Sequence, residues 1–395
     1  MRRSFALSLA LLRLVLLVST ATEEDYTDLD ARLDNILNES PDAGPVSATT
    51  TAPPASCRQG QRCVKKPLCR NESASETLID IKSNESNPCV DYLLQCCYEE
   101  DIIATIPQNV EIRNGENPVC GRRNPEGISF RIQSVGNNES EYGEFPWMVA
   151  VLSVFQVGDQ SVNAYLCGGS LIHPSVVLTA VHYVKNLKPE DLKIRAGEWD
   201  TQTENEIYPY QDREVVEIVG HPNFHKGGLF NDIALIILKA PVDFNDVIQP
   251  VCLPPPNTKF DRERCFVSGW GKNAFGKEGV YQAILKKIDL PIIPHTECQD
   301  ALRKSRSQPG FTVHDSFVCA GGKVGKDACK GDGGSPLVCP IPGLGEKYYQ
   351  VGIVAWGVGC GKGTPGLYAD VSHLRNWIDQ EMRKRDFDTN SYTAS

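Results

Sequence analysis

NDIALIIL, residues 231–238, contains IALIIL, a short alternating run of the kind that forms a strand. Similar short runs recur along the chain between Gly, Pro and Asn turns. They are MVAVLSVF at 148–155, KIRAG at 193–197, EVVEIVG at 214–220 and YQVGIVAWG at 349–357. Many short strands of this kind predict a mainly β fold, an antiparallel sandwich or barrel. HLRNWIDQEMRK at 373–384 then predicts a terminal helix.

The length and composition indicate an exported protein of more than one module. The 395 residues suit one full-sized domain, a smaller module and linkers. Residues 1–21 combine an arginine-containing start, a leucine-rich run and a small-residue ending, which predicts a cleavable secretory signal. No later run approaches the length of a membrane span. The net charge of −10 gives no general attraction to nucleic acid or anionic lipid, so protein partners are favoured.

The cysteine content and the polar segments agree with export. Fifteen cysteines in an exported chain predict disulfides rather than metal or redox chemistry. Residues 22–56 are acidic and then rich in Ser, Thr and Pro, which predicts a flexible lead, while 98–131 has the Pro and Gly content of a linker and 382–395 is a tail. Asn-x-Ser sequons predict N-glycosylation at Asn38, Asn71, Asn84 and Asn138.

Six cysteines gather in residues 57–97, spaced Cys57-x5-Cys63-x5-Cys69-x19-Cys89-x6-Cys96-Cys97. A segment this small is not stable on hydrophobic burial alone, so disulfides must hold it together. Six cysteines allow fifteen pairings, and spacing does not choose between them. The spacing, with its adjacent terminal pair, resembles the clip domain of arthropod proteases, and another small knotted module is the alternative. The resemblance implies the pairs Cys57–Cys96, Cys63–Cys89 and Cys69–Cys97.

Three further blocks carry the residue types of serine acyl transfer, which needs a hydroxyl, an imidazole base and a carboxylate that orients the base. They are LTAVHYV at 178–184, NDIALIIL at 231–238 and CKGDGGSPLVC at 329–339. Together with CGGSLI at 167–172 and VSGWG at 267–271, they resemble the chymotrypsin- and trypsin-like protease family. The resemblance implies a double β-barrel over residues 132–381, with His182 as the base and Asp232 as the orienting carboxylate.

The nucleophile loop departs from the family pattern. The family's Gly-Asp-Ser-Gly-Gly-Pro becomes Gly-Asp-Gly-Gly-Ser-Pro at residues 331–336, so Gly333 stands where the nucleophilic serine is expected. Ser335 comes two residues late, and a shift of several Å in a tight turn removes it from reach of His182. The resemblance therefore implies a degenerate triad of His182, Asp232 and Gly333, and an inactive protease homologue.

Two other departures lie near this triad. Ala355 replaces a serine that supports the orienting carboxylate in the family, and Tyr183 replaces a cysteine, which leaves Cys167 without its usual partner. We expect Cys167 to be a buried inert thiol, with an intermolecular bridge as the alternative. The remaining pairs implied by the resemblance are Cys120–Cys252, Cys265–Cys339, Cys298–Cys319 and Cys329–Cys360.

The resemblance also implies a specificity pocket and a cleavage site. Asp327, Gly357 and Gly366 match the trypsin-like pocket that receives Arg or Lys, with a closed or distorted pocket as the alternative. The bond between Arg131 and Ile132 stands where such proteases are cut, although IQSVG at 132–136 departs from the family's sequence. The resemblance implies that the new amino group at Ile132 would pair with Asp332. Arg70 in the clip segment is a second possible cut.

One acidic loop resembles the calcium loop of trypsins. GEWDTQTENEI at 197–207 offers Glu198, Glu204 and Glu206 as oxygen ligands for Ca²⁺. An ordinary exposed acidic loop is the alternative, and no cofactor is otherwise expected.

The leading functional hypothesis is a secreted, non-catalytic regulator of an extracellular proteolytic cascade. The resemblance implies arthropod haemolymph and prophenoloxidase activation, which leads to melanization in innate immunity. Expected partners are prophenoloxidase or its activating clip-domain protease, with a homo-oligomer after cleavage as a further expectation and no nucleic acid or membrane span. A residual trypsin-like endopeptidase and an adhesion or pattern-recognition protein are the alternatives.

Overall fold

The structure is a computed structural model, and it describes residues 57–70, 78–79, 88–89, 91–103, 120–129, 131–132, 138–157, 160–272, 279–306, 310–324, 331–357 and 363–394. The predicted signal at 1–21, the lead at 22–56, and Asn38, Asn71, Asn84, Asp327, Cys329 and Cys360 lie outside these residues. None of the helices within the described ranges is long and apolar enough to cross a membrane.

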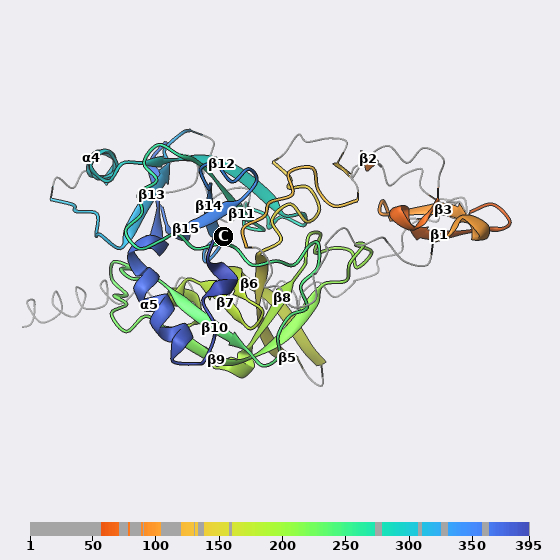
Figure 1. The fold of residues 1–395 in the computed structure, drawn as a ribbon, viewed down its shortest axis with the longest axis horizontal. Coiled ribbons are helices and arrows are strands. Elements are labelled where there is room, and N and C mark those ends of the chain that lie inside the picture. Colours follow the sequence, from red (N-terminus) through yellow and green to blue (C-terminus); the bar gives the residue numbers. More distant parts are fainter. Residues whose placement is uncertain are drawn as a thin grey trace, which may run out of the picture. The chain divides into compact units, whose positions relative to one another are not determined.

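The larger part of the described chain forms two closed six-stranded barrels, most strands of which are labelled in Figure 1. The first has the order β10 (Ala234–Leu238), β7 (Val176–Thr179), β6 (Gln160–His173), β5 (Met148–Val157), β8 (Leu192–Ala196) and β9 (Gln211–Gly220). The second has the order β11 (Arg264–Gly269), β12 (Lys286–Ile293), β13 (Phe317–Gly321), β16 (Pro365–Asp370), β15 (Tyr348–Trp356) and β14 (Pro336–Pro340). Neighbouring strands of each barrel pair antiparallel, so the prediction of a mainly β, double-barrel fold is confirmed.

The strand patterns explain why these runs form barrels. In β8, burial alternates along the strand, with Leu192, Ile194 and Ala196 inside, as expected for a strand with one face on a core. In β10, every residue is buried, so this strand does not show the alternation predicted for IALIIL. β10 is therefore covered on both faces, and it begins two residues after Asp232.

Short helices connect and close the barrels. α3 (Val181–Val184) follows β7 and carries His182. α4 (His295–Arg306) lies between β12 and β13. The predicted terminal helix is α5 (Val371–Arg383), whose first turn is capped by Asp370, because the Asp370 side chain accepts a hydrogen bond from His373 N. The single-turn 3-10 helices are η1 (Lys66–Leu68), η2 (Glu99–Asp101), η3 (Pro189–Asp191) and η4 (Asn390–Tyr392).

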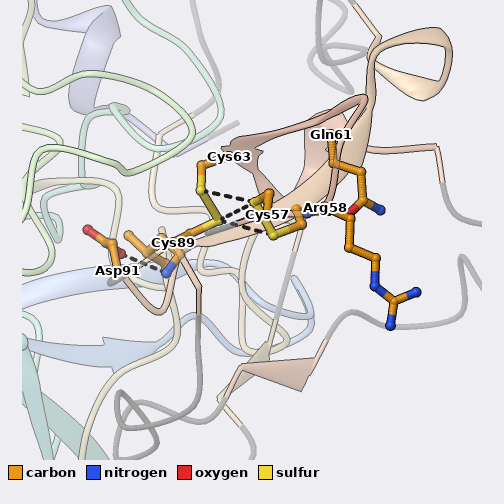
Figure 2. Close-up of a disulfide and its surroundings, with 8 residues drawn as sticks. Cys57, Arg58, Gln61, Cys63, Cys89 and Asp91 are labelled. Atoms are coloured by element: carbon orange, nitrogen blue, oxygen red, sulfur yellow. Dashed lines mark hydrogen bonds between the residues drawn. A yellow bond between two sulfur atoms is a disulfide. The ribbon is translucent and has the colours of Figure 1, made fainter. Parts of the chain in front are cut away.

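The clip segment is a two-stranded unit held by disulfides. β1 (Gln61–Lys65) pairs antiparallel with β3 (Leu94–Tyr98). Its bridges are Cys57–Cys96, Cys63–Cys89 and Cys69–Cys97, the pairs that the resemblance implies. Two of these bridges lie against each other, with Cys57 Sγ 3.5 Å from Cys63 Sγ and 3.6 Å from Cys89 Sγ (Figure 2). Covalent bonds thus fill the centre of a unit with little apolar core.

Three more bridges lie in the rest of the described chain, and one of them tethers the linker. They are Cys120–Cys252, Cys265–Cys339 and Cys298–Cys319. Residues after Cys120 continue this attachment, because Gly121 N donates to Pro250 O at 2.8 Å and Arg123 forms an ion pair with buried Glu144 at 2.6 Å. The segment just before Arg131 is therefore fixed to the barrels by a covalent bond and by a buried ion pair.

Candidate functional site

The predicted base and its orienting carboxylate meet in the structure. His182 Nδ1 lies 2.5 Å from Asp232 Oδ2, and the backbone N–H of His182 donates to Asp232 Oδ1 at 2.9 Å. The pairing of β10 with β7 brings them together, since α3 follows β7 and Asp232 precedes β10. Asp232 is fully buried, so these two contacts compensate for the loss of water around its charge.

The loop at residues 331–335 lies beside this pair and has a fixed backbone. Gly331 has φ +94, a conformation that favours glycine, and its carbonyl accepts a hydrogen bond from Tyr165 OH at 2.9 Å. The carbonyl of Gly333 accepts from Gly168 N at 2.9 Å. The loop is thus anchored to β6 through two of its carbonyl groups.

Ser335 is turned away from His182. Its side chain is fully buried, and its hydroxyl oxygen has no hydrogen-bond partner among the described residues. A Cβ added to Gly168 would lie 2.0 Å from this oxygen, so the hydroxyl points at the backbone of β6. In this position Ser335 cannot share a proton with the imidazole.

The space above Gly333 is occupied by Tyr183. A Cβ built on Gly333 would lie 2.2 Å from Tyr183 Cε2 and 2.5 Å from its hydroxyl oxygen. The Tyr183 ring also lies beside the His182 ring, tilted by 42° with 4.1 Å between ring centroids. Sequence reasoning found Tyr183 only as the residue that leaves Cys167 unbridged, and nothing in the local sequence signals its contact with Gly333.

Cys167 is a buried free thiol, one residue before Gly168. It is fully buried, and its Sγ lies 3.7 Å from Thr179 Oγ1. Burial raises the pKa of the thiol to about 12, so it stays protonated and unreactive at neutral pH. Ala355, the other departure from the family pattern, is also buried.

The predicted cleavage site is bound to the body of the protein. β4 (Arg131–Ile132) pairs parallel with β2 (Leu78–Ile79) of the clip segment. Ile132 is buried, and its backbone N–H donates to the carboxylate of buried Glu141 at 2.8 Å. The peptide bond after Arg131 is therefore held by a strand neighbour and a side-chain acceptor. Arg70, the second predicted cut, is exposed.

Asp332, the predicted acceptor of a new amino group at Ile132, lies in a tight glycine-lined position. Its Oδ1 accepts from Gly271 N at 2.9 Å, and a Cβ on Gly269 or Gly271 would approach this oxygen within 2.3 or 2.4 Å. In the intact chain, Ile132 N is bound to Glu141 rather than to Asp332.

The two described residues of the predicted specificity pocket face each other. A Cβ added to Gly357 would lie 3.8 Å from the Cα of Gly366.

The predicted calcium ligands are not gathered around one point. Glu198 pairs with Arg195 at 3.2 Å, and Glu204 accepts from Tyr210 OH at 3.0 Å. Glu206 accepts from the backbone N–H of Asp200 at 3.2 Å. Within the described ranges, the one group of ligating side chains lying within 4.8 Å of one another consists of four cysteines that form disulfides. The three carboxylates are therefore not preassembled around one point, and calcium binding to this loop stays a prediction.

Burial changes the acid strength of this loop. Burial first, and then the charge of Glu198, raise the pKa of Glu206 to about 8. Burial also raises the pKa of Glu198, against the opposing effect of Arg195. The pair therefore holds a proton at neutral pH.

Residues of the clip segment bind the same loop. Asp91 Oδ2 accepts from Thr203 Oγ1 and from Asn205 Nδ2, each at 2.7 Å. The Tyr92 hydroxyl donates to Asp200. Polar groups that would otherwise face solvent or an ion are thus bound within the chain.

Two antiparallel six-stranded barrels, a His-Asp pair between β7 and β10, and a three-disulfide module ahead of them define a trypsin-like protein with a clip domain. The family model "Trypsin" matches residues 134–378, and the model "Serine protease Clip domain PPAF-2" matches residues 50–98. The chain belongs to the clip-domain serine protease family.

Several curated relatives are similar over most of the chain. Phenoloxidase-activating factor 2 of Galleria mellonella is 52% identical over 302 residues, covering 75% of this chain and 98% of that protein. Inactive CLIP domain-containing serine protease A28 of Anopheles gambiae is 36% identical over 348 residues, covering 82% and 89%. Inactive CLIP domain-containing serine protease A8 of Anopheles gambiae is 38% identical over 332 residues, covering 81% and 88%.

Proposed function

We propose that this protein is a secreted, catalytically inactive cofactor of prophenoloxidase activation. The observation that supports catalytic inactivity is that Gly333, packed against Tyr183, provides no serine hydroxyl beside the His182–Asp232 pair. Without a nucleophile, acyl transfer has no covalent path. Loss of the serine in a protease of another fold lowers kcat by about 10⁶-fold, so cleavage by this chain would be negligible.

The similarity of this chain to other proteins supports the proposed role in prophenoloxidase activation. The 52% identity covers nearly the whole of a phenoloxidase-activating factor, and two other relatives are named inactive. A protein that cannot cut can still act by binding the protease or its substrate and by aligning them. The acidic net charge and the exposed sequon at Asn138 suit a glycosylated protein of the haemolymph.

We further propose that cleavage after Arg131 regulates this cofactor. The cut would free Ile132 from the strand pair and from Glu141, while Cys120–Cys252 would keep both pieces joined. A released strand and a new amino terminus could change the surface offered to a partner, including a second copy of the chain. On a gel, the cut protein should run as one band without reductant and as two with it.

The decisive experiment is prophenoloxidase activation by an authentic activating protease, with and without this protein. We expect phenoloxidase activity to rise when the protein is present and cut. The variant Arg131→Gln is the matched control, since it keeps the fold and removes the proposed cleavage site. No rise with either protein would refute the cofactor role.

A second experiment separates this function from a residual trypsin-like endopeptidase. The pure protein, intact or cut, should hydrolyse no arginyl or lysyl ester and should take up no serine-directed fluorophosphonate. Stoichiometric labelling would show that an activated serine exists after all.

A further inference from the structure

We propose that Tyr183 is a steric block that closes the vestigial catalytic centre, both to a side chain on residue 333 and to a substrate carbonyl beside His182. This inference rests on the proposed absence of catalysis and deepens it. It states that the missing hydroxyl is one of two defects, and that restoring the hydroxyl alone does not reopen the centre.

The distances leave no room for a serine. A Cβ on Gly333 would meet three atoms of Tyr183 at 2.2, 2.5 and 2.7 Å, all inside the 3.0 Å limit that real Cβ atoms respect. An acyl-transfer nucleophile must also have the reacting carbonyl about 3 Å away. The tyrosine ring fills the volume in which both groups would stand.

The backbone of Gly333 is not the obstacle. The φ angle of Gly333 lies outside the left-handed region, whereas Gly331 and Gly334 have φ angles of +94° and +77°. A side chain at residue 333 is therefore compatible with the local backbone conformation, and the contact that opposes this side chain is the clash with Tyr183.

The ring of Tyr183 is held where it stands. It packs against the main core cluster and lies 4.1 Å, centroid to centroid, from the His182 ring. His182 is in turn fixed by its two contacts with buried Asp232. Moving the ring aside would lose these packing contacts, so the retained His182–Asp232 pair also helps to hold Tyr183 in place.

The block also explains the free thiol. By resemblance, the position of Tyr183 belongs to a cysteine that bridges to Cys167, and a disulfide there would leave the space above Gly333 empty. One substitution thus removes a bridge and fills the nucleophile position. Cys167 remains as a buried thiol.

The first test uses the thermal unfolding of four variants to measure whether residues 183 and 333 are energetically coupled. Gly333→Ser should lower Tm by about 5 °C, because overpacking a filled site costs stability. Gly310→Ser is the matched control, since a Cβ on Gly310 meets nothing within 4 Å, and it should change Tm by about 1 °C or less. Gly333→Ser added to Tyr183→Ala should cost no more than this control. An equal cost with and without Tyr183 would overturn the steric block.

The second test uses a fluorophosphonate after cleavage at Arg131. In this reaction the serine oxygen bonds to phosphorus, fluoride leaves, and His182 takes the hydroxyl proton. Gly333→Ser/Tyr183→Ala should be labelled at least about tenfold faster than Gly333→Ser, and adding His182→Ala should abolish the gain. Equal labelling of the two variants, including none in either, would overturn the block. Because the prophenoloxidase assay uses the unaltered chain, a failed cofactor role is distinguishable from either result.

Discussion

The His182–Asp232 pair and the loop at residues 331–335 lie side by side, yet they differ in how their polar groups are used. Both carboxylate oxygens of Asp232 have a partner on His182, within 2.5 and 2.9 Å. Across the site, the buried hydroxyl of Ser335 has no partner in the described chain, and Gly333 has no room for a side chain. The difference teaches that a base and its carboxylate can persist for structural reasons, because a buried charge must stay paired, whereas a nucleophile has no such role.

The largest effect is expected from breaking the retained pair with Asp232→Ala. This change leaves the His182 backbone N–H and ring nitrogen without their buried acceptor, at a cost of about 3 kcal/mol. For a domain of this size the cost corresponds to a fall in Tm of about 9 °C, measured by calorimetry.

Asp243→Ala is the control for that prediction. The Asp243 side chain is 90% exposed and lies 3.4 Å from Arg213, so its loss should change stability by less than about 1 kcal/mol. Equal Tm values for Asp232→Ala and Asp243→Ala would show that the retained pair has no structural role.

A buried carboxylate that lies next to a second carboxylate should behave in the opposite way, and Glu206, beside Glu198, provides this case. Its pKa is raised to about 8 in the folded protein, so the folded state binds more protons than the unfolded state between about pH 4.5 and 8. Stability contributed by this group is therefore present at low pH and lost as pH rises through that window. Glu206→Gln should raise Tm by about 3 °C at pH 8.5 and leave it nearly unchanged at pH 5.

The exposed neighbour Glu204 offers a control for that pH dependence. Its carboxylate is hydrogen-bonded to Tyr210 at the surface, and Glu204→Gln removes the same charge from the same loop. If both variants gave the same pH profile, net loop charge rather than burial would explain the effect.

A smaller effect is expected from removing the buried hydroxyl of Ser335 in the loop at residues 331–335. Ser335→Ala removes a buried polar group that has no partner among the described residues, so Tm should rise by about 2–3 °C. Ser372→Ala is the matched change, because Ser372 is also buried but donates to Thr258 O at 3.0 Å, and it should lower Tm instead. Shifts of the same sign would mean that Ser335 has a partner.

Much of the fold follows from the sequence because its signals are local. KIRAG was predicted to alternate and β8 alternates, whereas β10, predicted as an alternating strand from IALIIL, is buried throughout. The meeting of His182 with Asp232 was predicted through the family resemblance, as were the bridges found in the structure. Local pattern and resemblance together therefore gave the barrels and the retained pair.

The remaining features depend on contacts between distant segments, which no local pattern specifies. Tyr183 and Gly333 are far apart in sequence, and neither residue type signals that one fills the space of the other. The acidic loop is compatible with a calcium site in sequence, and calcium binding there stays a prediction. In the structure, Glu198 turns toward Arg195 while Glu204 bonds to Tyr210. The spacing of the carboxylates does not determine these side-chain directions.

No change in assembly is expected from Cys167→Ala, which tests whether the thiol one residue before Gly168 has any role in oligomer formation. The thiol is fully buried and its pKa is raised to about 12, so the thiolate needed for disulfide formation is scarce at neutral pH. The variant should keep the oligomeric state of the parent on non-reducing gels and in light scattering. Its Tm should fall by about 3 °C, since removing one buried sulfur leaves only a small cavity.

Native alkylation provides the independent control, because a small iodoacetamide reagent should modify Cys167 in the parent only after unfolding. Rapid modification of the folded protein, or a covalent dimer that disappears in Cys167→Ala, would show that the thiol reaches the surface. In that case, the thiol left unbridged by Tyr183 would form an intermolecular contact. Cys167 would then serve in assembly, a role that the His182–Asp232 pair does not have.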